Sequence, residues 1–139
     1  MGKLVRFGVS IESDLLNGFD KYIAEKSYKN RSEAIRDLIR NNLIEKEWKD
    51  GNKDVVGTIT IVYNHHKWKL TDTLTDIQHL YHTSIISTLH VHLDHHNCLE
   101  VLVVKGKANE IRKISNQLIS TKGVKHGKLI TTTIGKDFS

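Results

Sequence analysis

The pattern of apolar and polar positions near the start of the chain predicts a short strand followed by two helices. In residues 4–11, LVRFGVSI, side chains alternate along the segment with the period of a strand. Ser13–Glu25 places its large apolar residues at helical spacing, and a second helical pattern runs from Asn30 to Trp48. Because no other strand pattern follows for about 40 residues, the first strand is expected to pair with its own copy in another chain.

Beyond these helices the pattern changes to alternating strands and helices. The charged Gly/Asn stretch KDGNKD, residues 49–54, separates the two patterns and predicts a domain boundary. We therefore expect two domains, residues 1–50 and residues 51–139. The order βαββαβ in the second domain is the ferredoxin-like arrangement, so the chain belongs to the α+β class. The expected strands cover 55–63, 84–93, 98–106 and 124–134, and the expected helices cover 70–82 and 108–120.

Composition narrows the class of protein. A hydrophobic content of 38% is low for a self-sufficient monomer of 139 residues, so oligomerisation is expected. The sequence has no long apolar run that would cross a membrane, and its first residues, MGKLVRFGVSIESD, lack the apolar core of a signal peptide. A single cysteine excludes an internal disulfide framework and suits a reducing compartment. These features predict a cytoplasmic protein without a membrane partner.

The charge of the chain gives a weak indication of an anionic partner. The net charge is +5 and the isoelectric point is about 9.3, as in many proteins that bind nucleic acid. Residues 1–50 hold 10 Lys/Arg and 9 Asp/Glu, so that half is nearly neutral. A DNA-binding domain there would depend on well-placed contacts more than on a strong electrostatic field.

The stretch His90–Cys98, HVHLDHHNC, gathers four of the nine histidines and the only cysteine. On a strand, His90 and His92 face the same side, and Cys98 opens the returning strand beside them. Two imidazoles and one thiolate suit Zn(II), Ni(II), Co(II) or Cu(II), whereas oxygen donors for Ca(II) or Mg(II) are sparse. His79 is a candidate fourth ligand, supplied either within the chain or by a symmetry partner.

Other interpretations of these residues remain open. A His-x-His pair on a strand is often ordinary surface, and a free cysteine is often a small buried side chain. No arrangement of nucleophilic catalysis is evident around Cys98. The remaining histidines are expected to be solvated or structural: His65, His66, His82, His95, His96 and His126.

Two classes of function fit such a metal site. One is a metal-sensing DNA-binding protein, and the other is a metalloenzyme or a metal carrier with an accessory helical domain. The N-terminal half distinguishes them, because an enzyme or carrier does not need a lone polar-faced strand followed by two short helices. The pattern therefore favours a regulator that is not an enzyme.

Several stretches together resemble one family along nearly the whole chain. RFGVSIESDLL and NRSEAIRDLIR resemble a ribbon–helix–helix DNA-binding head. YNHH, QH at 78–79, LHVHLDHHNCLEV and KGVKHGKL resemble the ACT-like βαββαβ body of the nickel-responsive transcriptional regulators (NikR). The HVH motif with its six-residue spacing to cysteine, together with the upstream QH, is a specific signature of this family.

The resemblance implies a repressor of nickel uptake genes that binds one Ni(II) per subunit. His90, His92 and Cys98 of one subunit and His79 of a neighbouring subunit would hold the ion. The site would be planar, which suits a d⁸ ion with imidazole and thiolate donors. Glu100, on the same strand face as Cys98, would support these ligands without binding the metal.

The resemblance also implies a homotetramer, a dimer of dimers, that binds a palindromic site in double-stranded DNA. Two N-terminal strands would pair into a ribbon in the major groove. Arg6, Gly8 and Ser10 would occupy the base-reading positions, although Gly8 lacks the side-chain donor that relatives carry there. The start of the second helix would contact phosphate through Asn30, Arg31 and Ser32.

Glu33 and Asp37 match an acidic pair that in relatives holds a second, hard cation between head and body. At this spacing two carboxylates repel on a free helix by about 0.2–0.5 kcal/mol. Instead of a cation, Arg36 or Arg40 could neutralise the negative charges of Glu33 and Asp37. The sequence leaves both interpretations of this pair open.

Overall fold

The computed structural model describes residues 2–67, 69–136 and 138. The chain forms two compact units, an N-terminal unit of Met1–Leu43 with Gly135–Ser139 and a C-terminal unit of Ile44–Ile134. The sequence placed a boundary at residues 49–54, whereas the two units divide inside the second helix. The reason is that Trp48, near the end of that helix, is buried in the core of the C-terminal unit.

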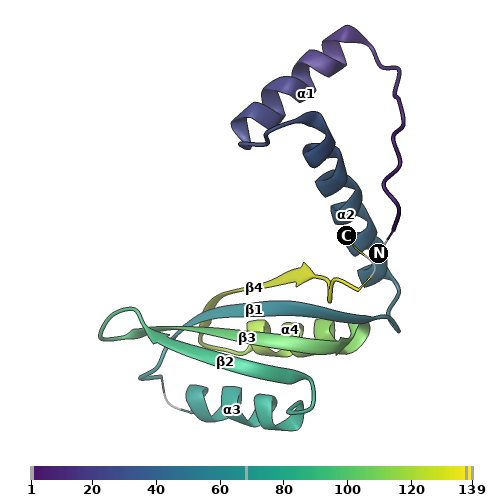
Figure 1. The fold of residues 1–139 in the computed structure, drawn as a ribbon. Coiled ribbons are helices and arrows are strands. Elements are labelled where there is room, and N and C mark those ends of the chain that lie inside the picture. The colour runs from purple at the N-terminus through teal and green to yellow at the C-terminus, as the bar shows by residue number, and fades with distance from the viewer. Residues whose placement is uncertain (1, 68, 137, 139) are drawn as a thin grey trace. The chain divides into compact units, whose positions relative to one another are not determined.

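The N-terminal unit contains helix α1, Ser13–Glu25, and the first part of α2, Arg31–Lys49 (Figure 1). The bounds of α1 match the prediction. Asn30 directly precedes α2, and its Oδ1 accepts a hydrogen bond of 2.9 Å from the backbone N–H of Glu33. This bond satisfies one of the free N–H groups at the start of the helix, as expected of an N-cap asparagine.

The strand expected over residues 4–11 does not form in the single chain. Residues 2–12 have no strand assignment, and the large side chains of this segment are exposed. A lone strand has no ladder of hydrogen bonds to join, so it needs a partner before it is stable. The most exposed of these side chains are Leu4, Val5, Phe7 and Val9.

The C-terminal unit is built on a four-stranded antiparallel sheet with the strand order β2-β3-β1-β4. Helices α3 and α4 lie on one face of this sheet (Figure 1). The order of elements confirms the predicted βαββαβ arrangement. The elements are β1 Asp54–Asn64, α3 Leu70–Leu80, β2 Ile85–His92, β3 Asn97–Lys107, α4 Ala108–Ser120 and β4 Val124–Thr132.

The core of this unit lies between the sheet and its helices. Alternate residues of β1 from Val55 to Tyr63 are buried, and alternate residues of β3 from Cys98 to Val104 are buried as well. The apolar side of α4 completes the core. Because Cys98 belongs to this buried row, the metal-ligand candidates lie at the edge of the hydrophobic core.

No helix in the described part of the chain is both long and apolar enough to cross a membrane.

Candidate metal centre

The register of the sheet brings the ligand candidates together on its helix-covered face. His92 pairs with Cys98 and His90 pairs with Glu100 across β2 and β3. Tyr63 of β1 pairs with Cys98 from the other side. Side chains of directly paired residues point to the same face of a sheet. The two histidines of the HVH motif therefore lie beside the buried Cys98 and Glu100.

His65, His92 and Cys98 form a compact group of potential ligands. The Sγ atom of Cys98 lies 3.1 Å from Nδ1 of His65 and 3.4 Å from Nδ1 of His92. One ligand atom from each residue lies within 4.8 Å of the other two. A thiol and two imidazoles are donors of the softness that Ni(II), Zn(II), Co(II) and Cu(II) prefer, so the residues present fit a borderline transition metal.

His65 is the residue of this group that the sequence analysis expected to be solvated. In the structure it is half-buried, and its backbone N–H donates a hydrogen bond of 3.0 Å to the carbonyl oxygen of His96. His65 follows Tyr63 by two positions, and Tyr63 pairs with Cys98. His65 itself lies in the turn that follows β1, so its hydrogen bond to His96, together with the pairing of Tyr63 with Cys98, keeps it beside the thiol.

His90 lies next to this group but is not part of it. Its ring stacks on that of His92 with the centroids 5.5 Å apart, and its Nε2 lies 3.4 Å from the hydroxyl oxygen of Tyr63. His79 is exposed near the end of α3 and also lies outside the group. The single chain thus joins His92 to Cys98, flanks them with His90, and leaves His79 apart.

Glu100 is a buried carboxylate held by two side chains. The hydroxyl of Tyr63 donates to its Oε2 at 2.9 Å, and Nε2 of Gln78 donates to its Oε1 at 2.8 Å. Burial, and then the hydrogen bond to Glu100, raise the pKa of the Tyr63 phenol. Gln78 directly precedes His79, so Glu100 links the helix that carries His79 to the sheet that carries His90.

The electrostatic surroundings shift the pKa values of the Cys98 thiol and the His65 imidazole in opposite directions. Burial raises the pKa of the Cys98 thiol, and the negative charges of Glu100 and Asp94 raise it further. Burial lowers the pKa of His65, and the neighbouring histidines lower it further. A neutral imidazole offers the lone pair that a metal needs, and a bound cation would displace the thiol proton.

The turn between β2 and β3 is held by Asp94. Its Oδ1 accepts hydrogen bonds of 2.8 Å from the backbone N–H groups of His96 and Asn97. The side-chain amide of Asn97, followed by these two N–H groups, lowers the pKa of Asp94 to about 2. Because Asn97 directly precedes Cys98, the turn fixes the start of the strand that carries the thiol.

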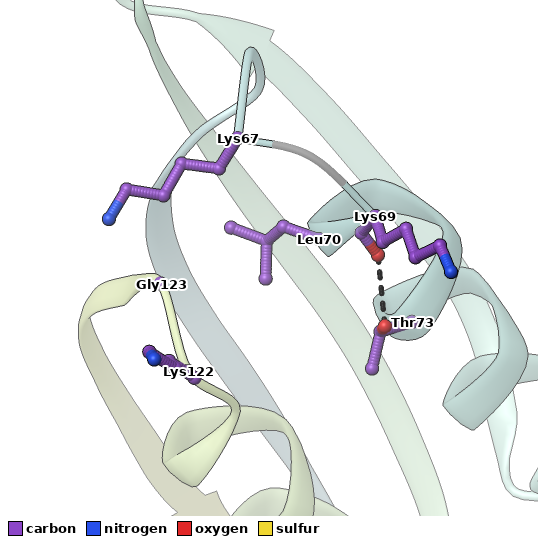
Figure 2. Close-up of a pocket in the computed structure, with 6 residues that line it drawn as sticks. All are labelled: Lys67, Lys69, Leu70, Thr73, Lys122 and Gly123. Atoms are coloured by element: carbon purple, nitrogen blue, oxygen red, sulfur yellow. Dashed lines mark hydrogen bonds between the residues drawn. The ribbon is translucent and has the colours of Figure 1, made fainter.

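A pocket lies at the start of α3 (Figure 2), and none of its described lining residues belongs to this group of ligands. Lysine side chains line it, and the hydroxyl of Thr73 donates to the backbone carbonyl of Lys69 at 2.9 Å. Its described lining contains no histidine, cysteine or carboxylate, so it has no metal ligands of the predicted type and no acid–base pair. The lining residues are Lys67, Lys69, Leu70, Thr73, Lys122 and Gly123.

The side chains predicted to contact DNA lie on exposed parts of the N-terminal unit. Arg6, Gly8 and Ser10 belong to the exposed segment of residues 2–12. Arg31 forms a two-point ion pair with Asp20, with Nε–Oδ1 and Nη2–Oδ2 distances of 2.9 Å. This hydrogen-bonded pair lowers the pKa of Asp20. Asn30 caps α2, as described above, and Ser32 is exposed in its first turn.

The acidic pair of α2 is already matched by positive side chains. Arg36 forms an ion pair with Glu33, and Arg40 donates to Asp37 at 2.8 Å. The Tyr28 hydroxyl also donates to Asp37 at 2.7 Å, and its hydrogen bond, followed by that of Arg40, lowers the pKa of this carboxyl. A second cation at these residues would have to share the carboxylates with the two arginines.

Comparison with known proteins covers both units. Residues 56–132 match the family model described as the NikR C terminal nickel binding domain, and residues 5–46 match the ribbon–helix–helix protein, copG family. A protein of Nitratidesulfovibrio vulgaris (strain Miyazaki F) named as a nickel-responsive regulator is 59% identical over 139 residues, all of both chains. A protein of Geotalea uraniireducens with the same name is 60% identical over 137 residues, 99% of both chains.

The fold of part of the chain also occurs in a solved structure. An uncharacterized protein from Thermotoga maritima matches with a TM-score of 0.53 and 18% identity, covering 58% of this chain and 100% of that chain. At this identity the likeness shows the fold alone.

The two matched families account for the division of the sequence into a strand–helix–helix pattern and a βαββαβ pattern. They support the regulator over the metalloenzyme or metal carrier, because the relatives are named as regulators and both matched models belong to regulator families. A ribbon–helix–helix model matches the N-terminal part of the chain and a nickel-binding-domain model matches the C-terminal part, and relatives are about 60% identical over their full length. The chain therefore belongs to the NikR family of nickel-responsive transcriptional regulators.

Proposed function

We propose that the protein is a cytoplasmic repressor of nickel uptake genes that binds operator DNA when Ni(II) is present. The observation that carries this proposal is the strand register, which sets His90 and His92 directly beside Cys98 and Glu100 in a domain of the nickel-binding family. The ribbon–helix–helix match in the other half supplies the DNA-binding element.

The proposed nickel site holds one ion per subunit through His90, His92 and Cys98, with His79 from a neighbouring subunit. Bound Ni(II) would supply a cation that favours four ligands in a plane. The exposure of His79 within one chain supports its use by a second chain. Glu100 would orient the ligands indirectly. It accepts hydrogen bonds from Gln78 and Tyr63, and so connects α3, which carries His79, to the sheet.

The proposed assembly is a homotetramer, in which pairs of N-terminal segments form two ribbons. Two sets of exposed apolar side chains support it. The first is the segment of residues 2–12, and the second lies on the edge strand β2 and the residue that follows it. Apolar side chains on unpaired strands are typical of surfaces that pair in an oligomer. The second set is Ile86, Leu89, Val91 and Leu93.

The proposed DNA contacts are Arg6, Gly8 and Ser10 in the major groove of a palindromic site. Phosphate contacts would come from the start of α2. Their support is the exposure of these residues and the family match over residues 5–46. Nickel would act by a population shift, which requires that it bind the DNA-competent arrangement more tightly than the others.

A spectroscopic experiment tests the metal half of this proposal. Titration of the purified protein with Ni(II) should produce a sulfur-to-nickel charge-transfer band in the near ultraviolet, reaching its limit at one equivalent per chain. Cys98→Ser should abolish the band, because it removes the only thiol of the chain. His126→Ala is the matched control, since His126 pairs with Val62 on the opposite face of the sheet. A band that persists in Cys98→Ser would place the nickel elsewhere.

A further inference from the structure

The end of α2 is built into the C-terminal unit by Trp48. Its side chain is 2% exposed and belongs to the core of that unit. The indole N–H donates a hydrogen bond of 2.9 Å to the carbonyl oxygen of Thr132 in β4. The absence of a side chain at Gly57 makes room for the ring, since a Cβ there would lie 3.3 Å from Cη2 of Trp48. The last turn of α2 is therefore fixed to the sheet.

Arg112 of α4 contacts Trp48 in two ways. Its guanidinium carbon lies 5.5 Å from the centre of the indole ring, and its Nη2 donates to the backbone carbonyl oxygen of Trp48. The carbonyl groups in the last turn of a helix have no partner within the helix, and a positive charge there also favours the helix dipole. We call these contacts of Arg112, together with the hydrogen bond from the Trp48 indole to Thr132, the Trp48–Arg112 clamp.

The turn that follows α2, where the sequence predicted a domain boundary, is also fixed by hydrogen bonds. The backbone N–H groups of Ala108 and Asn109 donate to the carbonyl oxygens of Lys53 and Gly51 at 3.0 and 3.1 Å. Ala108 and Asn109 are the first residues of α4, whose N–H groups lack partners within the helix. The turn thus caps α4, so it does not act as a free tether between α2 and the sheet.

We propose that Arg112 is a positioning residue for nickel-dependent DNA binding. Through the Trp48–Arg112 clamp it holds the last turn of α2 to the nickel-binding unit. Because α2 begins beside the predicted phosphate contacts and its last turn is held in this clamp, loosening that turn would weaken the effect of nickel on the DNA-binding residues. This inference rests on the proposed function, and its experiment has one part that is independent of DNA.

The DNA-independent part is hydrogen exchange on the metal-free full-length protein. Arg112→Ala should increase exchange at the amides of residues 44–53 while the amides of β1 and β3 stay protected. Lys113→Ala is the matched control, because it removes a positive charge from the next, exposed position of the same helix. Unchanged exchange at 44–53 in Arg112→Ala would overturn the clamp. Loss of protection throughout the sheet would show a structural role only and would also overturn the proposal.

The second part measures operator affinity with and without Ni(II) for each variant. Arg112→Ala should bind one equivalent of nickel with the wild-type absorption band, but the nickel-induced gain in operator affinity should fall about 3- to 30-fold. Arg112→Lys should lose less, since an ammonium group can still donate to the Trp48 carbonyl. Trp48→Phe, which keeps an aromatic ring but removes the indole N–H, should show a similar loss if Arg112→Ala proves too unstable to study.

The results distinguish a failure of the positioning role of Arg112 from a failure of the proposed function. A wild-type gain in operator affinity that is retained by both Arg112→Ala and Trp48→Phe would overturn the positioning role and leave the proposed function intact. A wild-type protein without any gain would contradict the proposed function and, with it, the positioning role, even if hydrogen exchange had confirmed the clamp.

Discussion

At the residue scale, the central question is which imidazoles accompany Cys98 around a bound ion. The structure places His65 and His92 against the thiol, with His90 one ring further away. The family resemblance implies His90 and His92 instead, together with His79 of a neighbour. The two sets share His92 and Cys98, so among the ligands from a single chain only His65 and His90 distinguish them.

Paired substitutions at these two positions should identify the set. We expect His90→Ala to weaken Ni(II) binding by at least about 10-fold, the loss expected when even a supporting group of a metal site is removed. His65→Ala should leave the affinity within about 2-fold, because in the proposed site it is not a ligand. Both affinities are measured by competition with a chelator of known nickel affinity.

The reverse result would contradict the proposed ligand set. If His65→Ala loses nickel and His90→Ala keeps it, the ion is held within one chain by the group of His65, His92 and Cys98. The ligand field should then also differ, since three ligands in one chain do not impose a planar site.

The sequence could predict part of this site and not the rest. The spacing in HVHLDHHNC was enough to predict that His92 lies beside Cys98, because strand period and a short turn determine that pairing. It could not reveal His65, whose position depends on the register of β1 against β3, a pairing between segments far apart in the chain. The network of Tyr63, Gln78 and Glu100 depends on the same register and on the packing of α3.

At the element scale, amphipathic periodicity was a sufficient guide to the helices. α1 and α4 have the predicted bounds, and α3 ends two residues earlier than its pattern suggested, at Leu80. The N-terminal strand stays a prediction, because the single chain lacks the second copy with which this strand is expected to pair. The packing of α2 onto the sheet through Trp48 was not visible in the sequence, because one tryptophan at a helix end has no periodic signal.

Close packing of α4 against β4 gives a stability prediction. A Cβ at Gly127 would lie 2.5 Å from Cγ1 of Ile119, closer than any normal contact. Gly127→Ala should therefore lower the free energy of unfolding by about 1–3 kcal/mol, as expected for overpacking. Chemical denaturation followed by circular dichroism measures this change.

Gly8→Ala is the matched control for this substitution. A Cβ at Gly8 meets no atom of the described chain within 4 Å, so the change should stay within about 0.5 kcal/mol. Equal stability of the two variants would show that α4 and β4 do not pack as closely as the structure indicates.

At the scale of the whole molecule, the proposal requires that subunits share nickel sites. His79 belongs to the same chain as Cys98 but lies outside its group of ligands. Mixed assemblies of His79→Ala chains and Cys98→Ala chains should therefore regain some complete sites, each formed by the intact His79 of one chain and the intact Cys98 of another.

Titration of the mixed assemblies with Ni(II) measures this recovery through the charge-transfer band. Each variant alone is the control and should lack the wild-type band. If subunit exchange is verified and the mixture shows no recovered band, each site is built within one chain, and nickel would not link subunits as proposed.

The most direct test of the central claim is the affinity for operator DNA with and without Ni(II). Both affinities must be measured at one fixed salt concentration, because salt alone changes protein–DNA affinity by orders of magnitude. The proposed function predicts that one equivalent of nickel tightens operator binding by about 5- to 150-fold, and that operator DNA tightens nickel binding by the same factor. Equal operator affinities in the two conditions, on a palindrome that the protein binds specifically, would contradict the account.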